Sequence, residues 1–199
     1  MNFWDHNFSG AGYKYGTAPN AFIAAEAHRL ARGSRVLVPG DGEGRNGVWL
    51  AQQGHDVTAV DYSQVGLDKA RALAAQRGVT LHTELADLTE WEAPAQLFDA
   101  LALVFVHLPT AIRAQVHQRL LQALKPGGLV LIEAFTPKQL HLRSGGPKDV
   151  AMLYTLDLLR ADFAAETREL MSLECETHLD EGPGHQGPAH VVRGVWQKC

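Results

Sequence analysis

Residues 36–61 constrain the fold of this chain more than any other segment. They combine a short apolar run, a glycine-rich turn, an apolar-periodic helix and a second apolar run, which is the order of a βαβ unit in a parallel sheet. Gly40, Gly42 and Gly44 let the backbone of the turn approach a ligand where a Cβ would collide. Asp61 ends the second run, where a carboxylate can accept hydrogen bonds from both hydroxyls of a ribose. The unit therefore predicts a site for a nucleoside-containing ligand.

The spacing of the glycines distinguishes between kinds of nucleotide site. A dinucleotide-binding turn has the spacing G-x-G-x-x-G, with the third glycine just inside the helix. Here the spacing is G-x-G-x-G, and Arg45 stands where that third glycine is required. The turn also lacks the Gly-Lys-Ser/Thr ending of a P-loop. The motif therefore disfavours a pyrophosphate or a nucleoside triphosphate, and a tight turn without any ligand is the plain structural alternative.

The composition is that of one globular domain. The chain has 199 residues, of which 46% are hydrophobic and 20% are charged. A net charge of −4 offers no electrostatic basis for tracking phosphates, so we expect no nucleic-acid partner. No apolar run approaches the roughly 20 residues of a membrane span, so no membrane partner is expected either. The first residues also lack the basic-then-apolar layout of a signal peptide.

Cysteine and histidine usage gives no sign of a disulfide framework or of a metal site. Only Cys175 and Cys199 are present, and none of the ten histidines has metal-ligand spacing. We therefore expect no metal and a cytoplasmic location, since few cysteines suit a reducing compartment.

Strand and helix patterns alternate from the first third of the chain to residue 135. Alternation of this length predicts a doubly wound, mostly parallel sheet with helices on both faces. Ser63 can cap the third helix, and the continuous apolar run after Phe98 is typical of a central strand covered on both faces. The expected helices are 19–31, 45–53, 63–76 and 109–123, and the expected strands are 35–39, 56–61, 79–83, 98–105 and 129–135.

The last third of the chain has a different pattern. Residues 136–152 show little periodicity, and a loop of this length usually has a functional role such as a lid. A helix is expected near 155–163. Two strands, 166–178 and 189–197, then flank a Gly/Pro/His-rich turn at 181–188 and predict a hairpin.

The 36–61 unit resembles motif I of the class I S-adenosylmethionine (SAM) methyltransferases. In that family the loop bends around the amino-acid part of SAM, and the acidic residue that ends the second strand holds the ribose. The segments 15–20 (Tyr-Gly-Thr-Ala-Pro-Asn) and 43–46 (Glu-Gly-Arg-Asn) resemble the branch that contains the tellurite-resistance and thiopurine methyltransferases. Ala86-Asp87-Leu88 is similar to the family's adenine-binding turn, and 124–128 (Leu-Lys-Pro-Gly-Gly) is similar to its turn before the fifth strand.

The resemblance implies an α/β fold. It is a Rossmann-like, doubly wound, seven-stranded and mostly parallel sheet that ends in a C-terminal antiparallel hairpin strand. We expect a single domain over residues 1–199. Its parts are an N-terminal cap and helix at 1–34, a SAM-binding core at 35–135, and an acceptor-side loop with the terminal hairpin at 136–199.

The resemblance also implies SAM as cofactor and a set of cofactor-binding residues. One departure is Val38, because many members carry an acidic residue there that helps to anchor the methionine ammonium. Loop carbonyls, Asp41 or Glu43 are the substitutes that this sequence offers. The residues expected to bind the cofactor are Tyr15, Gly40, Asp41, Gly42, Gly44, Arg45, Asn46, Asp61, Tyr62, Ser63, Ala86, Asp87, Leu88, Val104 and His107.

The implied activity is methyl transfer from SAM to a small-molecule acceptor. A soft nucleophile, such as a thiol or a tellurium or selenium oxyanion, fits the branch and needs little help from a general base. No residue is identified as that base, although His107, Glu181 and His185 are within reach. The loop 136–152, Phe135, Tyr154 and the turn at 181–188 are expected on the acceptor side.

Two other classes of function stay open at this point. A SAM-binding protein without catalytic activity would share the same motifs. A nicotinamide-dependent oxidoreductase is disfavoured by Arg45 and by the terminal hairpin. The identity of the acceptor and the oligomeric state are not encoded in any motif, because a substrate pocket varies independently of the fold.

Overall fold

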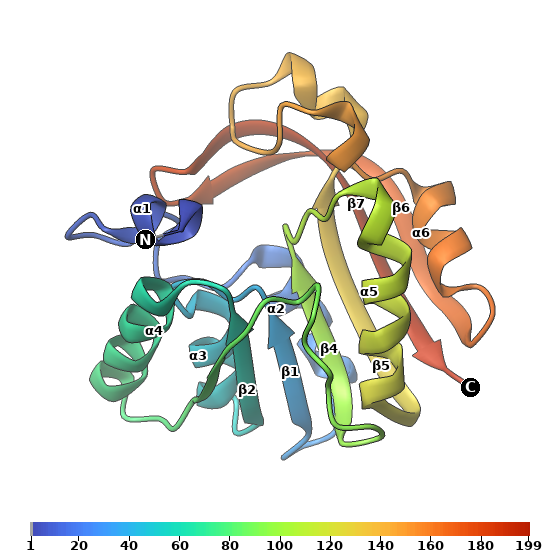
Figure 1. The fold of residues 1–199 in the computed structure, drawn as a ribbon, viewed down its shortest axis with the longest axis horizontal. Coiled ribbons are helices and arrows are strands. Elements are labelled where there is room, and N and C mark those ends of the chain that lie inside the picture. Colours follow the sequence, from blue (N-terminus) through green and yellow to red (C-terminus); the bar gives the residue numbers. More distant parts are fainter. Residues whose placement is uncertain (1) are drawn as a thin grey trace.

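The computed structural model describes residues 2–199, which form a central sheet with helices on both faces (Figure 1). The strands are β1 (Arg35–Pro39), β2 (Asp56–Asp61), β3 (His82–Leu85), β4 (Phe98–Val104), β5 (Leu124–Phe135), β6 (Thr167–Glu181) and β7 (His185–Lys198). The helices are α1 (Phe3–Phe8), α2 (Ala21–Glu26), α3 (Arg45–Gln52), α4 (Gln64–Arg77), α5 (Thr110–Ala123) and α6 (Leu156–Phe163). Three short 3-10 helices are η1 (Ala27–Arg29), η2 (Pro137–His141) and η3 (Val150–Met152).

The seven strands form one sheet in the order β3-β2-β1-β4-β5-β7-β6. The first five strands pair in parallel. β7 lies between β5 and β6 and is antiparallel to both. The predicted doubly wound sheet with an antiparallel terminal hairpin is therefore confirmed, whereas a dehydrogenase-type sheet would have ended in a parallel strand.

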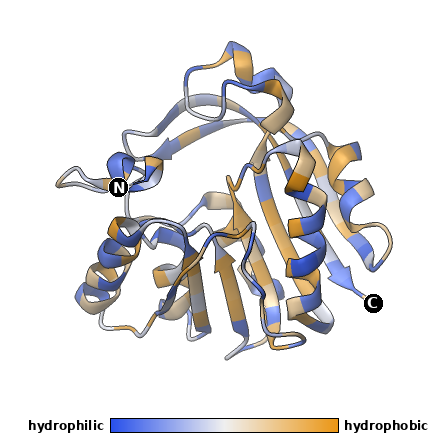
Figure 2. Cartoon of the chain, viewed as in Figure 1, coloured by the Kyte–Doolittle hydropathy of each residue, from blue (hydrophilic) through white to orange (hydrophobic). Residues whose placement is uncertain are grey.

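The core is divided by the sheet into two apolar layers. Successive residues of β4 point to opposite faces, so Leu101 and Leu103 pack with α5 and α6 while Ala100 and Ala102 pack with α3 and α4. β1 behaves in the same way, and the central strands are coloured as hydrophobic along most of their length in Figure 2. This two-sided burial holds the carboxyl ends of the strands in fixed positions.

Local signals explain where α4, one of the two longest helices, begins and ends. Ser63 caps α4 by accepting a hydrogen bond from the backbone N–H of Gly66 at 3.0 Å. Gly78 ends the helix in a left-handed conformation with φ 68°, which glycine adopts without a Cβ penalty.

The structure corrects several of the expected boundaries. Helix α1, whose capping box joins Asn2 to Asp5, was not expected from the sequence. The expected loop 136–152 contains η2 and η3, and the third strand begins at His82 rather than at residue 79. The turn expected at 181–188 shrinks to three residues, because β6 and β7 stay paired up to Glu181 and His185.

The long β6–β7 hairpin arches over the carboxyl edge of the sheet, and its tip lies beside the N-terminal segment (Figure 1). The backbone N–H of Gly184 donates to the carbonyl of Lys14 at 2.8 Å. A Cβ at Gly182 would come within 2.3 Å of the Gly16 nitrogen, so the two segments meet backbone to backbone.

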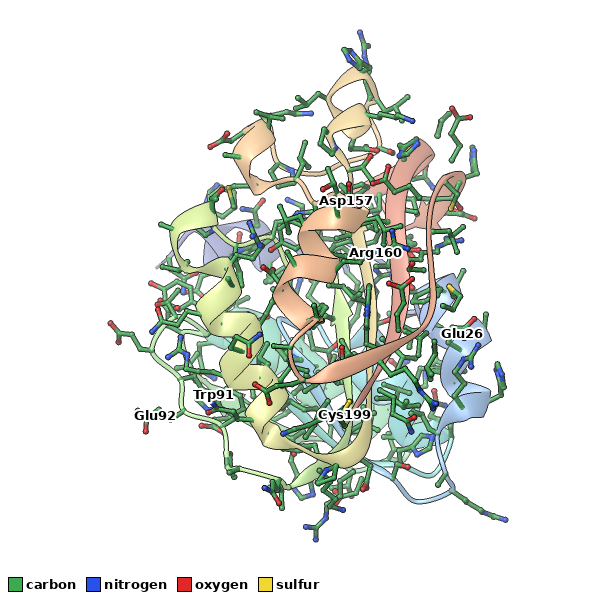
Figure 3. All side chains as sticks on the ribbon, turned by 90° about the vertical axis from the view of Figure 1, so that its right-hand side faces the viewer. Glu26, Trp91, Glu92, Asp157, Arg160 and Cys199 are labelled. Atoms are coloured by element: carbon green, nitrogen blue, oxygen red, sulfur yellow. The ribbon has the colours of Figure 1, made fainter. Side chains whose placement is uncertain are left out.

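Helix α6 packs beside α5, where its buried Asp162 accepts a hydrogen bond from Arg113 at 2.8 Å. Asp157 and Arg160 lie on its outer side in Figure 3, and Arg160 pairs with Glu169 of β6 at 2.9 Å. Among the helices of residues 2–199, none combines the length and apolar character that a membrane crossing requires.

Candidate functional site

A pocket of about 770 Å³ opens at the carboxyl edge of the parallel strands. The loops that follow β1, β2, β4 and β5 line it, α1 closes one side, and the hairpin tip covers it. Open α/β sheets bind their ligands at this edge, where the strand order reverses. We call this cavity the site pocket.

The glycine-rich turn after β1 needs glycine for its own conformation. Gly40, Gly42 and Gly44 have φ values of 66°, 58° and 90°, which lie in the left-handed region. Added Cβ atoms would come within 2.8 Å of Val106, 2.9 Å of Phe8 and 2.6 Å of Ala70, respectively. We expected these glycines to make room for a ligand. The space beside all three is instead occupied by protein, so they shape the turn and let it pack tightly.

Asp61 is held at the edge of the site pocket by backbone donors. One carboxylate oxygen accepts from the N–H of Gly42 and the other from the N–H of Ser63, both at 2.8 Å. Burial raises the pKa of Asp61, and these backbone hydrogen bonds act against that rise. Each oxygen keeps a lone pair for a ligand hydroxyl.

Asp41 provides a second buried carboxyl group. It accepts from the N–H of Gly47 at 3.1 Å, and it lines the site pocket. Burial raises the pKa of Asp41 to about 7, and the nearby charge of Asp61 adds to the rise. The site pocket therefore holds a carboxyl group that changes its charge near neutral pH.

Glu43 does not reach the site pocket. Its carboxylate pairs with Lys69 at 2.7 Å and accepts from the backbone N–H of Lys14 at 2.6 Å. It ties the N-terminal segment to α4. Of the two acidic substitutes suggested for the missing group at Val38, only Asp41 faces the site pocket.

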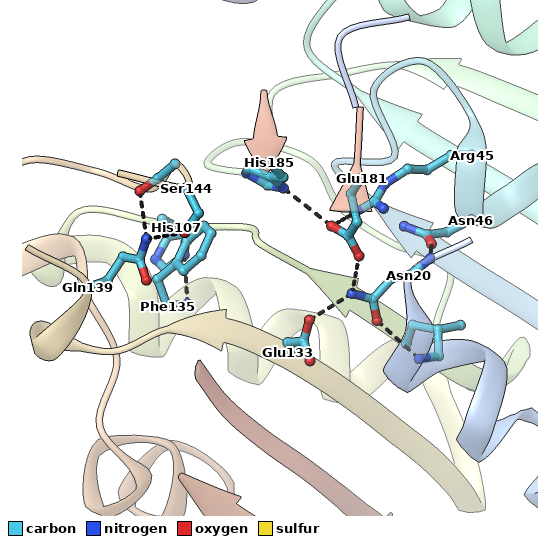
Figure 4. A network of polar contacts seen from close by, with 12 residues as sticks. Asn20, Arg45, Asn46, His107, Glu133, Phe135, Gln139, Ser144, Glu181 and His185 are labelled. Atoms are coloured by element: carbon cyan, nitrogen blue, oxygen red, sulfur yellow. Dashed lines mark hydrogen bonds and ion pairs between the residues drawn. The ribbon is translucent and has the colours of Figure 1, made fainter. Parts of the chain in front are cut away.

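A buried polar network joins α3, the helix that follows the glycine-rich turn, to the hairpin (Figure 4). Arg45 donates to Glu181 at 2.8 Å, and the Asn20 amide donates to Glu181 at 2.9 Å and to Glu133 at 2.7 Å. Arg193 pairs with Glu133. The two arginines balance the two carboxylates, which buried charges require. Nη1 of Arg45 is buried and has no hydrogen-bond partner in the protein. Arg45 also lines the site pocket.

Aromatic rings form the opposite side of the site pocket. Phe105 stacks on Phe135 with ring centroids 4.3 Å apart. His185 packs against Phe105 at 4.7 Å and against Tyr15 at 4.3 Å. Phe105 has a φ of 54°, a strained conformation for a non-glycine residue that often marks a functional position. We call these four residues the aromatic wall.

His107 stands behind this wall with both ring nitrogens engaged. Nδ1 donates to the Met152 carbonyl at 2.7 Å, and Nε2 accepts from the N–H of Phe135 at 3.2 Å. Burial lowers the pKa of His107 to about 4. His107 is therefore neutral and links the end of β4 to η3. Neither of its ring nitrogens is free to bond to a ligand, so a ligand can contact only the ring.

The structure brings most of the expected cofactor residues together and leaves three outside. Ser63 caps α4, Gly44 packs on α4, and Ala86 packs against the hydrophobic core. Those that line it are Tyr15, Gly40, Asp41, Gly42, Arg45, Asn46, Asp61, Tyr62, Asp87, Leu88, Val104 and His107.

The sequence analysis missed the contribution of α1 to the site. Phe3, Trp4 and Phe8 line the pocket, and Asp5 anchors the helix by accepting from the Ser63 hydroxyl at 2.7 Å. The sequence does contain a signal for this helix: Asn2 is followed three positions later by Asp5, which is the spacing of a capping box at a helix start. Within residues 2–199, no group of three or more His, Cys, Asp or Glu side chains is placed to hold a metal ion.

The strand order and the acidic and glycine-rich pocket edge define a Rossmann-like nucleoside-binding domain. A family model described as a methyltransferase domain matches residues 36–128. Thiopurine S-methyltransferase from Vibrio cholerae is 35% identical over 135 residues, which cover 60% of this chain and 61% of that protein. Thiopurine S-methyltransferase from Vibrio atlanticus is 30% identical over 151 residues, which cover 65% of this chain and 69% of that protein.

The chain belongs to the class I SAM-dependent methyltransferases and is related to the thiopurine S-methyltransferases. The structure of TehB from Haemophilus influenzae has the same fold, with a TM-score of 0.76 at 18% identity, over 92% of this chain and 63% of that one. The match spans about three fifths of the length of the Vibrio cholerae relative.

Proposed function

We propose that the chain is an enzyme that transfers the methyl group of SAM to a flat aromatic small molecule, with a soft atom such as a thiol sulfur as the acceptor. The observation that carries the proposal is the division of the site pocket into a polar side and an aromatic wall. The polar side suits a nucleoside with an amino-acid tail, and the aromatic wall suits a planar ring.

The polar side offers a partner for each part of SAM. We assign the two ribose hydroxyls to the Asp61 carboxylate, because Asp61 lines the site pocket and each of its oxygens accepts a single backbone hydrogen bond. The free Nη1 of Arg45 is a buried donor without a partner, and the methionine carboxylate would supply one. We assign the adenine to the part of the site pocket lined by Asp87 and Leu88, which follow Ala86, whose N–H donates to the Asp61 carbonyl at 3.0 Å.

The aromatic wall supports an organic ring over an inorganic oxyanion as the acceptor. Phe105 is half-buried at the pocket, and Phe135 is buried behind it; these apolar rings would not compensate a tellurite or selenite ion for its lost hydration. A fused ring system buries apolar area against the same faces and gains a stacking contact. The Vibrio relatives act on thiopurines, which are planar and carry sulfur.

The chemistry asked of the protein is alignment and exclusion of water. The SAM sulfonium supplies an already activated methyl group. The hairpin tip and α1 cover the site pocket, and the aromatic wall orients the acceptor toward the polar side. A thiolate acceptor needs no proton removed during transfer.

A turnover screen tests the proposal by measuring release of S-adenosylhomocysteine. Its arms are heteroaromatic thiols, phenols, aliphatic thiols, and tellurite with selenite, and calorimetry compares S-adenosylhomocysteine with NADH. We expect binding of S-adenosylhomocysteine alone and fastest turnover with heteroaromatic thiols. Binding without turnover in any arm would favour a non-catalytic SAM-binding protein, and turnover limited to tellurite or selenite would overturn the aromatic acceptor.

A further inference from the structure

The site pocket contains one histidine whose proton-accepting nitrogen is free. Both nitrogens of His107 are engaged, as described above. His185 uses only Nδ1, which donates to Glu181 at 3.3 Å. Among the hydrogen bonds of residues 2–199, none involves Nε2 of His185. The edge of the ring that carries Nε2 lies beside Gly145, where an added Cβ would come within 3.0 Å of that nitrogen.

Arg45 and Asn20 hold the Glu181 carboxylate in place, and the carboxylate in turn orients His185. One oxygen of Glu181 accepts from both Arg45 at 2.8 Å and His185, and the other accepts from the Asn20 amide at 2.9 Å (Figure 4). The carboxylate therefore orients the imidazole with Nδ1–H toward itself and leaves Nε2 as the acceptor. The arrangement has the geometry of a base held by a third group.

The charges around His185 set its resting state. Burial lowers the pKa of His185, and the Glu181 carboxylate opposes that change. Burial alone would raise the pKa of Glu181, but its hydrogen bonds with His185 and Arg45 bring it to about 2. His185 is therefore neutral near neutral pH, beside an ionised Glu181. The titratable and charged groups that face the ring are Glu181 on β6, Arg45 on α3, Lys14 and Tyr15 in the N-terminal segment, and His107 after β4.

We infer that His185 is the general base for acceptors that enter the site with a proton, and that Glu181 is its positioning residue. The inference rests on the proposed function and extends it to hydroxyl acceptors on planar aromatic rings. The ring would lie against Phe105, which Phe135 supports from behind, with its hydroxyl toward Nε2. His185 belongs to the aromatic wall itself, so the base is next to the place where the ring stacks.

The step balances without any further reactant. A lone pair of the acceptor oxygen forms the bond to the methyl carbon. The carbon–sulfur bond breaks, and its electron pair stays on the sulfur. The hydroxyl proton moves to Nε2 of His185, and the positive charge that forms on the imidazole is stabilised by Glu181 at 3.3 Å. The proton then leaves to water, which restores the neutral base.

The experiment compares two acceptor series in wild type and in His185→Gln. Substituted phenols keep their proton at mildly alkaline pH, whereas aromatic thiols are largely ionised there and need no base. We expect His185→Gln to lower kcat about a hundredfold with phenols and less than about threefold with thiols. The control is His190→Gln, because His190 is buried on the same strand but lies outside the site pocket and bonds to Thr136. It should leave both series unchanged.

The dependence of kcat on pH provides a second test, because it would not change if His185 and Glu181 had only a structural role. Wild type should lose kcat with phenols as the pH falls and His185 becomes protonated, and Glu181→Gln should shift this loss to lower pH. The shift follows because the carboxylate that raises the pKa of His185 is gone. An unshifted profile, or an equal loss with both acceptor series, would overturn the role of His185 while leaving the methyltransferase activity in place. Absence of turnover by wild type with any acceptor would overturn the proposed function as well.

Discussion

The two sides of the site pocket are built from different parts of the chain and by different means. The polar side is made mostly by one continuous segment, where Gly42 and Ser63 direct backbone N–H groups at Asp61. The aromatic wall is made by side chains from four separate segments, held against one another by ring contacts such as Phe105 on Phe135. Backbone geometry binds a constant ligand, whereas side-chain packing can change with the acceptor while the turn stays the same.

The largest expected effect is on the polar side. Asp61→Ala should weaken S-adenosylhomocysteine binding by about a hundredfold or more. The reason is that two charge-assisted hydrogen bonds to the ribose, each about 1.5–3 kcal/mol, are lost together. Calorimetry measures the change. Asp99→Ala is the control, because Asp99 lies on β4 outside the site pocket and pairs with Lys125 at 2.7 Å. Unchanged affinity in a folded Asp61→Ala protein would mean that the ribose lies elsewhere.

A smaller and separate effect is expected on the aromatic wall. Phe105→Leu should raise KM for an aromatic acceptor about tenfold, since it removes a ring face and two aromatic pairs. Binding of S-adenosylhomocysteine should change less than about twofold, since the polar side is untouched. Phe98→Leu is the matched control, because Phe98 is buried at the start of β4, the strand that Phe105 directly follows; it should lower stability without changing KM. Equal losses of cofactor and acceptor binding would erase the distinction between the two sides.

The smallest expected effect concerns the support of the aromatic wall by His107. Its pKa in the folded protein is lowered to about 4, so below about pH 6.5 the unfolded chain binds a proton that the folded chain does not. The stability that depends on neutral His107 is therefore complete above that pH and is lost as the pH falls toward 4. Urea unfolding should show a loss of about 1–2 kcal/mol from His107 between about pH 7 and pH 5.

His107→Gln should reduce this difference between the two pH values, whatever it does to stability at neutral pH. The exposed His6 provides the control, since His6→Gln should leave the full difference in place. An undiminished pH dependence in His107→Gln would show that protonation elsewhere weakens the protein.

The polar side could be predicted from the sequence because its residues lie close together along the chain. The turn, the helix and the strand end occur within 36–61, and periodicity and glycine spacing report on each of them. The hairpin was predicted, but its length was not, because pairing of 181–185 depends on the N-terminal segment beneath it. The helix α1 was missed because six residues carry almost no periodic signal.

The aromatic wall could not be predicted from the sequence. Phe105, Phe135 and His185 lie in separate parts of the chain, and only the tertiary fold brings their rings within 5.3 Å of one another. The engagement of both nitrogens of His107 also depends on a long-range contact, with Met152. These contacts distinguish two histidines that look equivalent in the sequence.

The meeting of Lys14 with Gly184 has a consequence for how the protein is made. The contact joins two segments that are far apart in the sequence, so the cover of the pocket forms only after the hairpin tip at Gly184 has left the ribosome. The sheet strands that pair early in the sequence can form first, and loop closure over such a distance comes late and slowly. A growing chain would carry the complete turn and Asp61 while still lacking His185, so ligand-binding ability should precede catalytic ability during synthesis.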